Sequence, residues 1–315
     1  MMLIEYKNFS YNIKGSVITV GNFDGVHKAH AILLKELYNR SLEKKLNSIV
    51  ITFEPHTKTV LYPEKNYKIL TTLQEKALLI ESFGIDFLVW IKFTKKFSQI
   101  SYKEFIEDII IKKFNAKEWI LGDDHAFGKN KEGNKNVLQS AIAKNHIDCF
   151  FMSDITEKNK KVSSSNIREL ILEGRIKEAR EMLGHPYLIK GERITGKKRG
   201  TELGYPTINF RVSNKYKLLP PSGVYAGVLE YNNRQWIGAR YLGKCPTFSE
   251  KDFRIEFYEI NFSKEEPKEG DSANIWLYDY IREDISFSSK DKMVKKINED
   301  INIIKNFFSG EKICL

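Results

Sequence analysis

The chain has few cysteines and no long apolar run. Its cysteines, Cys149, Cys245 and Cys314, are far apart and odd in number, so they supply neither a disulfide framework nor the spacing of a zinc site. No uninterrupted apolar stretch approaches the roughly 20 residues that a membrane-spanning helix needs. The first residues also lack the apolar core of a signal peptide. We therefore expect a cytoplasmic protein with no membrane partner.

A nucleic-acid recognition motif is also missing, although the net charge is +10 at neutral pH. The lysines are spread through the chain among many Ile and Asn residues, a pattern that an AT-rich genome also produces. Small polyanions such as nucleotides explain a basic protein equally well. We expect small-molecule substrates and no nucleic acid, while a non-enzymatic nucleic-acid-binding protein stays open as an alternative that draws only on the charge.

The first part of the chain alternates strand-type and helix-type segments. The expected strands are 17–20, 47–53, 86–90, 118–121 and 147–152, and the expected helices begin near residues 29, 72, 101 and 135. Such alternation predicts an α/β fold with a parallel sheet that is covered on both faces. Its ligand crevice should lie at the carboxyl ends of the strands.

From Tyr187 onward, short β-type runs are separated by Gly and Pro. These runs are 187–194, 207–212, 224–231, 235–241, 253–262 and 273–280. Their spacing predicts an antiparallel barrel or sandwich, followed by a final helix from about Ser289 to Gly310. We place the boundary near residue 185, which gives domains 1–184 and 185–315. Helices within 165–183 would end the first domain or connect the two.

The segment Val17–His30 predicts a strand, a tight turn and a helix start. Gly21 and Gly25 let the backbone approach a ligand closely, and the helix start offers free N–H groups to an anion. His27 and His30, three residues apart, can project from the same side. This turn therefore suits a phosphate group.

Three more polar segments follow expected strands or precede a helix. They are Glu54–His56, Gly122–Gly128 and Val162–Arg168. Imidazoles, serine hydroxyls, helix-start N–H groups and one arginine can together hold a phosphoanhydride without any P-loop. The set supports attack on an α-phosphate with pyrophosphate leaving. A metal site through the two turn histidines is disfavoured, because no third ligand lies at close spacing.

The second part has its own polar constellation. Gly196, Lys198 and Gly200 belong to a glycine-rich basic loop that can close over nucleotide phosphates, although the loop alone fits a hairpin with solvated lysines as well. Downstream, the Thr207 hydroxyl and the Asn209 amide oxygen are hard ligands that suit Mg²⁺. Two carboxylates follow in 253–262, and strand alternation places Glu256 and Glu259 on opposite faces.

The motifs G-N-F-D-G-V-H-K-A-H (21–30) and S-S-S-N-I-R (163–168) resemble the two signatures of flavin-adenylating nucleotidyltransferases. T-F-E-P-H (52–56) and G-D-D-H-A-F-G (122–128) resemble two further blocks of that group. From about residue 14 to about 308, the chain resembles the bacterial bifunctional riboflavin kinase/FAD synthetase family. The resemblance implies a Rossmann-like nucleotidyltransferase domain, then a riboflavin kinase-like antiparallel barrel with a C-terminal helix.

The resemblance also implies roles for individual residues. The expected catalytic residues are His27, His30 and Arg168 for adenylylation and Glu256, as base, for phosphorylation. The expected ATP and phosphate ligands are Gly21, Asn22, Phe23, Asp24, Gly25, Ser163, Ser164, Ser165, Gly196, Lys198 and Gly200. The flavin would contact His56, Asp124, Phe127 and Arg282, and Mg²⁺ would bind Thr207 and Asn209. The implied substrates are riboflavin, FMN and ATP. We expect the protein to be a monomer or a weak homo-oligomer.

The chain departs from the family pattern at several positions. Ala29, Thr57 and Ser165 replace the usual Gly, Pro and Thr, and His125-Ala126 replaces Phe-Arg. In the kinase half, Asn261 stands at an Asp position and the Tyr-Gly before the last barrel strand is missing. The departures in the kinase half leave open a monofunctional FMN adenylyltransferase with a degenerate, flavin-binding barrel. A flavin-sensing protein without activity also stays open, and it draws only on the basic charge.

Overall fold

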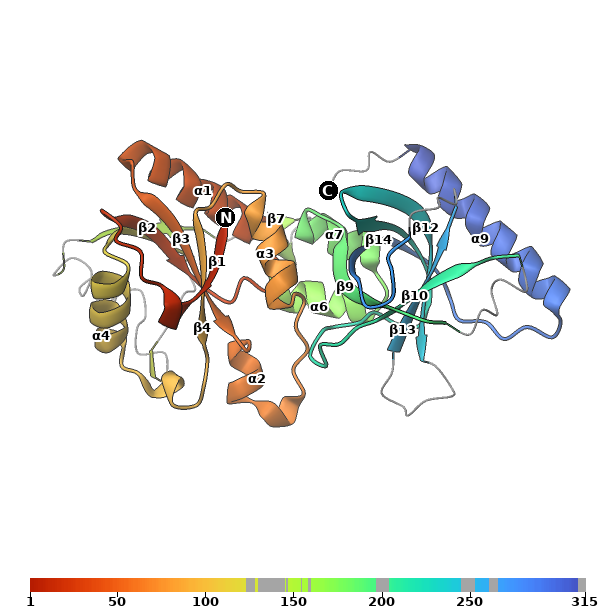
Figure 1. The fold of residues 1–315 in the computed structure, drawn as a ribbon, viewed down its shortest axis with the longest axis horizontal. Helices are drawn as coiled ribbons and strands as arrows, with labels where there is room; N and C mark the ends of the chain where they lie inside the picture. The colour runs from red at the N-terminus through yellow and green to blue at the C-terminus, as the bar shows by residue number, and fades with distance from the viewer. Residues whose placement is uncertain are drawn as a thin grey trace. The chain divides into compact units, whose positions relative to one another are not determined.

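The structure is a computed structural model that describes residues 1–122, 128–129, 145, 147–153, 155–157, 160–196, 204–244, 253–260 and 266–310 (Figure 1). The chain forms two compact units, Met1–Ser163 and Ser164–Leu315. The boundary between catalytic domains after residue 184 stays a prediction. No helix within the described ranges is both long and apolar enough to cross a membrane.

The first unit is built on a six-stranded sheet with the order β1-β4-β3-β2-β5-β6, in which all paired strands run parallel. The strands are β1 (Met2–Glu5), β2 (Ser16–Val20), β3 (Asn47–Glu54), β4 (Phe87–Lys92), β5 (Ala116–Gly122) and β6 (Asp148–Met152). The predicted parallel α/β sheet is therefore confirmed. Strand β1 was not expected, because it is short and half exposed at the sheet edge and so lacks the run of buried residues that marks the central strands.

Helices cover this sheet on both faces. On one face, Ile18, Val89 and Trp119 share a core with the π-helical segment η4 (Phe105–Lys113). Neighbouring residues on each strand point the other way, where α1 (Lys28–Lys44) packs on β2, β3 and β5. The other helical segments are η1 (Tyr6–Asn8), α2 (Thr57–Leu61), η2 (Pro63–Lys65), α3 (Leu73–Glu81), η3 (Phe97–Gln99) and α4 (Tyr102–Glu104).

Two of the predicted helix starts are capped by side chains. Thr72 and Glu75 form a reciprocal capping box at α3, and the Ser101 side chain accepts a hydrogen bond from the Glu104 N–H at α4. The expected helix after Ser101 is wound more widely over η4, which places Phe105, Ile106, Ile109 and Ile110 in the core. The helix expected over 135–145 lies outside the described residues except for its last position. A two-stranded hairpin, β7 (Thr156–Glu157) and β8 (Lys160–Lys161), precedes the second unit.

The second unit contains a closed antiparallel barrel with the strand order β10-β13-β12-β11-β14-β9. Its strands are β9 (Tyr187–Ile194), β10 (Thr207–Arg211), β11 (Gly223–Tyr231), β12 (Arg234–Lys244), β13 (Phe253–Glu259) and β14 (Ser272–Glu283). Helix α6 (Ser164–Leu172) packs on α7 (Ile176–Leu183), which packs on β9 and β14. The final helix, α9 (Lys290–Gly310), lies against β11 and β12 (Figure 1). The predicted barrel and C-terminal helix are confirmed.

Two candidate active sites

The turn between β2 and α1 has an unusual backbone. Phe23, Gly25 and Val26 all adopt positive φ angles of 47°, 88° and 42°. For non-glycine residues this conformation costs about 1–3 kcal/mol, so the surrounding packing must hold it. The Phe23 and Val26 side chains are each only 2% exposed and supply that packing. The turn therefore has a conformation that lowers the stability of the fold, and backbone strain of this kind is common at functional sites.

Hydrogen bonds tie the turn to the ends of neighbouring elements. The Gly21 N–H donates to the Ile51 carbonyl (3.0 Å), which extends the β2–β3 contact. The Asn22 side-chain amide donates to Thr57 Oγ1 (3.0 Å), and its oxygen accepts from the Thr57 N–H (3.3 Å). The Thr52 hydroxyl donates to the Asn22 carbonyl (3.2 Å). The turn is thus clamped on the start of α2 and the end of β3.

Asp24 has a structural task in this turn. One of its carboxylate oxygens accepts hydrogen bonds from the N–H groups of Leu70 (2.8 Å) and Thr71 (3.0 Å). The next residue, Gly25, donates its N–H to Thr71 Oγ1 (2.9 Å). Asp24 therefore connects the turn to the segment before α3, and its predicted contact with ATP stays a prediction.

His27 and His30 lie together, as their spacing predicts. Their rings stack with centroids 3.7 Å apart and an interplanar angle of 15°. Burial lowers the pKa of His30 well below its usual value, and the charges of His27 and Lys76 lower it further. A neutral imidazole donates one N–H. We therefore expect His30 to act toward a phosphate as a hydrogen-bond donor and not as a cation.

His56 joins the same cluster from the end of β3. It caps α2, because its Nδ1 accepts a hydrogen bond from the Lys58 N–H (3.1 Å). This bond assigns the proton to Nε2, which lies 4.0 Å from Asp24 Oδ2. The ring also stacks on Tyr67, with centroids 5.0 Å apart. The residues Gly21, Asn22, Phe23, Asp24, Gly25, His27, His30 and His56 are thus brought into one region, and their roles in binding stay predictions.

Sequence reasoning missed a buried lysine beneath this site. Lys76 on α3 is 3% exposed, and its ammonium donates to Thr52 Oγ1 (2.9 Å). Burial lowers the pKa of Lys76 to about 8, against the opposite effect of Asp24 and Glu54. Burial also raises the pKa of Glu54, which Lys76 partly offsets. A signal existed in the sequence, since Lys76 falls on the same helical stripe as the apolar residues Leu79 and Ile80.

The serine–arginine motif spans the division of the chain into its two units. Ser163 ends the first unit, while Ser164, Ser165 and Arg168 belong to α6 of the second, where Ile167 anchors the helix in the core. The predicted residues Asp124, Phe127, Lys198 and Gly200 lie outside the described residues. Their roles and that of the serine–arginine motif stay predictions.

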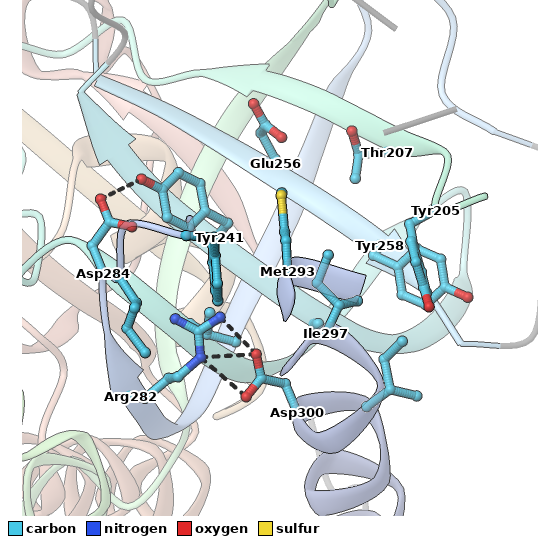
Figure 2. Close-up of a pocket in the computed structure, with 15 residues that line it drawn as sticks. Tyr205, Thr207, Tyr241, Glu256, Tyr258, Arg282, Asp284, Met293, Ile297 and Asp300 are labelled. Atoms are coloured by element: carbon cyan, nitrogen blue, oxygen red, sulfur yellow. Dashed lines mark hydrogen bonds and ion pairs between the residues drawn. The ribbon is translucent and has the colours of Figure 1, made fainter. Parts of the chain in front are cut away.

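The second unit has a cavity of about 370 Å³ between the outer face of the barrel and α9 (Figure 2). It is lined by Tyr205, Thr207, Val224, Ala239, Tyr241, Glu256, Tyr258, Arg282, Asp284, Ile285, Phe287, Met293, Ile297, Asp300 and Ile301. Three residues predicted from the sequence, Thr207, Glu256 and Arg282, are therefore brought to one cavity. A pocket of this size, with aromatic and aliphatic walls and a set of polar side chains, suits a small-molecule ligand.

Asn209 and Gly196 lie beside this cavity. Asn209 pairs with Glu256 across β10 and β13 and with Ile194 across β10 and β9. A Cβ on Gly196 would lie only 2.3 Å from Asn209 Nδ2, so the close approach needs glycine. Thr207 and Asn209, two residues apart on one strand, share a face and offer oxygen donors next to the Glu256 carboxylate, a donor set that fits Mg²⁺. No cluster of three or more His, Cys, Asp or Glu side chains that could hold a metal occurs in the described part of the chain.

Two polar pairs shape the walls of the cavity. Arg282 on β14 binds Asp300 on α9 through Nε (3.1 and 2.9 Å) and a terminal nitrogen (2.7 Å). The Tyr241 hydroxyl donates to Asp284 Oδ2 (2.8 Å), and Figure 2 shows both pairs pointing toward one another. Burial and the neighbouring carboxylate raise the pKa of Tyr241, so this phenol stays protonated. Arg282 therefore acts in this structure as the anchor of α9.

Strand β13 separates its two carboxylates as predicted. Glu256 lines the cavity, whereas Glu259 is 6% exposed. Because alternate residues of β13 point to opposite faces, Glu259 lies on the side of Ile255 and Phe257, inside the barrel. Of the two carboxylates on β13, only Glu256 is therefore placed to contact a ligand of the cavity.

Comparison with known proteins places both units in described families. A family model for FAD synthetase matches residues 10–166, and one for riboflavin kinase matches residues 183–308. A protein of Buchnera aphidicola subsp. Schizaphis graminum named bifunctional riboflavin kinase/FMN adenylyltransferase is 38% identical over 93% of this chain and 94% of its own. A protein of the same name from Listeria monocytogenes is 32% identical, over 93% and 92%.

A solved structure shares the fold over nearly the whole chain. A crystal structure described as a macrolide-efflux protein from Streptococcus pneumoniae matches with a TM-score of 0.86 and 26% identity, over 97% of this chain and 99% of that one. The family predicted from the sequence motifs is confirmed by the two family models and by relatives over nearly their full length. The chain belongs to the bifunctional riboflavin kinase/FMN adenylyltransferase family.

Proposed function

We propose that the chain catalyses two successive reactions of flavin cofactor synthesis. The barrel unit transfers the γ-phosphoryl group of ATP to riboflavin and gives FMN. The α/β unit then transfers AMP from a second ATP to FMN, which gives FAD and pyrophosphate. The observation that carries the proposal is the pairing, in one chain, of a carboxylate-bearing aromatic cavity with a histidine turn at the strand ends of a parallel sheet.

In the kinase reaction, Glu256 is proposed to accept the proton of the riboflavin 5′-hydroxyl as its oxygen attacks the γ-phosphorus. The bond to the β–γ bridging oxygen breaks, and ADP leaves. Thr207 and Asn209 would hold Mg²⁺, which neutralises phosphate charge when bound. The loop with Gly196, Lys198 and Gly200 would cover the nucleotide, and the aromatic walls of the cavity would hold the flavin ring beside Arg282.

In the adenylylation, a phosphate oxygen of FMN attacks the α-phosphorus of ATP. A new P–O–P bond forms, the α–β bridge breaks, and pyrophosphate leaves with the electron pair. His27, His30 and Arg168 are proposed to hold the phosphates, with Ser163, Ser164, Ser165 and the turn residues 21–25 as further ligands. The neutral His30 fits the donor role because burial disfavours its charged form. His56, Asp124 and Phe127 would contact the flavin.

A monofunctional adenylyltransferase is less well supported. The relatives that carry the two-activity name are matched over 92–94% of their own length, including the barrel. The departure at Asn261 lies outside the described residues. The proposal of an active barrel is supported by Thr207 and Glu256, which line one cavity, and by Asn209, which pairs with Glu256 on the neighbouring strand. We further propose that the enzyme works in the cytoplasm without a nucleic-acid or membrane partner. We propose a monomer or weak homo-oligomer, and sedimentation of the purified protein would check this oligomeric state.

The decisive experiment incubates purified protein with riboflavin, ATP and Mg²⁺ and separates the flavins by chromatography. We expect both FMN and FAD. Glu256→Gln should abolish FMN formation and still give FAD from supplied FMN, because only the kinase loses its base. Glu192→Gln, which changes a surface carboxylate on β9 of the same barrel, serves as the control and should keep FMN formation. Folded wild-type protein that makes neither product would contradict the proposal.

A further inference from the structure

The buried ammonium of Lys76 is the strongest polar feature near the histidine turn that the proposed chemistry leaves without a task. It enters from α3, a helix that carries none of the predicted site residues. The carboxylates of Asp24, from the turn, and Glu54, from β3, favour the charged form of Lys76. Lys76 in turn disfavours the charged form of His30, which lies on α1. A buried cation is costly unless it is compensated, so its place among these groups needs a reason.

Lys76 determines the direction of a hydroxyl group. Its ammonium donates to Thr52 Oγ1 at 2.9 Å, and a hydroxyl has a single hydrogen. With Lys76 as the donor, that hydrogen is directed to the Asn22 carbonyl at 3.2 Å. The chain of bonds therefore runs from α3 through the end of β3 to the turn. Loss of the ammonium would free the Thr52 hydroxyl to turn away from Asn22.

Lys76 also balances charge under a phosphate site. Asp24 is 2% exposed, and Glu54 at the end of β3 is raised in pKa by its burial. Ionised carboxylates at this depth repel a triphosphate, because charges interact more strongly where water is excluded. The lysine offsets one of these negative charges without itself reaching the surface. Its cation is thus placed to lower the repulsion that incoming ATP meets.

We propose that Lys76 is a positioning residue for adenylyl transfer, whose buried charge offsets Asp24 and Glu54 and whose hydrogen bond to Thr52 fixes the phosphate turn. The inference rests on the proposed adenylylation of FMN. It adds a residue from α3 to a site so far made from the turn, β3 and α1. Because the kinase site lies in the other unit, FMN formation by the same molecules is an internal measure of intact protein.

The test compares Lys76→Met with the exposed-lysine control Lys35→Met, which lies on α1 of the same unit. Once wild-type protein has been shown to make FAD from FMN, Lys76→Met should lose at least about tenfold in kcat for this step, which corresponds to about 1.4 kcal/mol. FMN formation should stay within twofold, and Lys35→Met should leave both steps unchanged. Equal FAD formation by Lys76→Met and wild type would overturn the proposal, whereas wild-type protein without any FAD formation would instead contradict the proposed function.

A pH profile distinguishes positioning by charge from a merely structural role and does not depend on a variant that folds. Since the pKa of Lys76 is about 8, kcat/KM for FMN adenylylation by wild-type enzyme should fall as pH rises through this value, while the kinase profile should lack the fall. Thr52→Val, which keeps the charge, should lose activity but retain the alkaline fall, and Lys76→Met should lack it. An adenylylation profile that is flat from pH 7 to 9.5 in wild-type enzyme would refute the role of the charge.

Discussion

The arginine inside the barrel provides a sharp test of the energetics of this fold. Arg240 on β12 is fully buried, and none of its three side-chain nitrogens has a hydrogen-bond acceptor among the described residues. Its guanidinium lies over the Phe257 ring, 3.2 Å from the centroid. Space for it comes from Gly227, where a Cβ would lie 3.1 Å from Arg240 Cγ. Burial lowers the pKa of Arg240, and Glu259 is the charge that opposes this shift.

The magnitude follows from the cost of each ion. Several kcal/mol are needed to bury a charged group, and the attraction within a pair only partly offsets them. Arg240→Met removes one ion but leaves the Glu259 carboxylate buried without its cation, so we expect a loss of about 3–5 kcal/mol. Arg240→Met/Glu259→Leu removes both ions, and stability should return to the wild-type value or exceed it by about 1–4 kcal/mol.

Hydrogen exchange of β12 and β13 peptides, measured by mass spectrometry, gives the opening free energy of the barrel alone. Arg211→Met is the matched control, because Arg211 on β10 pairs with Glu192 at the surface, with half of its side chain exposed. That variant should cost less than about 1 kcal/mol. If Arg240→Met were as stable as wild type, or if the effects of Arg240→Met and Glu259→Leu simply added, the reasoning from paired burial would be wrong.

Two further predictions concern the anchors of each unit. Asp300→Asn should raise the KM for riboflavin severalfold and leave FMN adenylylation unchanged, because Asp300 binds Arg282 through two nitrogens and fixes α9 as a wall of the cavity; an unchanged KM in steady-state kinase assays would contradict this. Thr72→Ala should destabilise the first unit by about 1 kcal/mol through loss of the capping box at α3, as urea denaturation followed by loss of FAD formation would measure, and no shift in the midpoint would refute it.

The elements that the sequence predicted well are those with a regular apolar pattern or a capping residue. Strands β2 to β5, the helix start at Thr72 and the final helix after Ser289 all have such local signals, and each is found within a few residues of its expected place. Strand β1 has four residues at the edge of the sheet and half-exposed side chains, so its sequence does not differ from that of a loop. Its position follows from its pairing with β4, which is a tertiary contact.

The candidate sites were predictable where a motif lies in one continuous segment. The turn with Gly21, Gly25 and both histidines is such a segment, and its histidines lie together as predicted. Thr207 and Glu256 lie far apart in the sequence, and their common site was expected only from a family pattern. The task of Asp24 was not predictable, because its partners Leu70 and Thr71 lie more than forty residues away. Contacts of that sequence separation leave no periodic signal.

Buried charges mark the limit of sequence reasoning most clearly. Lys76 and Arg240 are cations in a chain with 51 Lys and Arg. Apart from the apolar stripe that Lys76 shares with Leu79 and Ile80, their neighbours along the sequence do not distinguish them from solvated cations. Burial makes the charged form of each side chain costly, because in a medium of low polarity a cation needs an opposite charge or an aromatic ring beside it. Lys76 meets Asp24 and Glu54 at a site where ATP is proposed to bind, whereas Arg240 meets Glu259 inside a closed barrel. The effect of the Lys76 charge is therefore measured by the rate of FAD formation. The effect of the Arg240 charge is measured by the stability of the barrel, so the two residues need different assays.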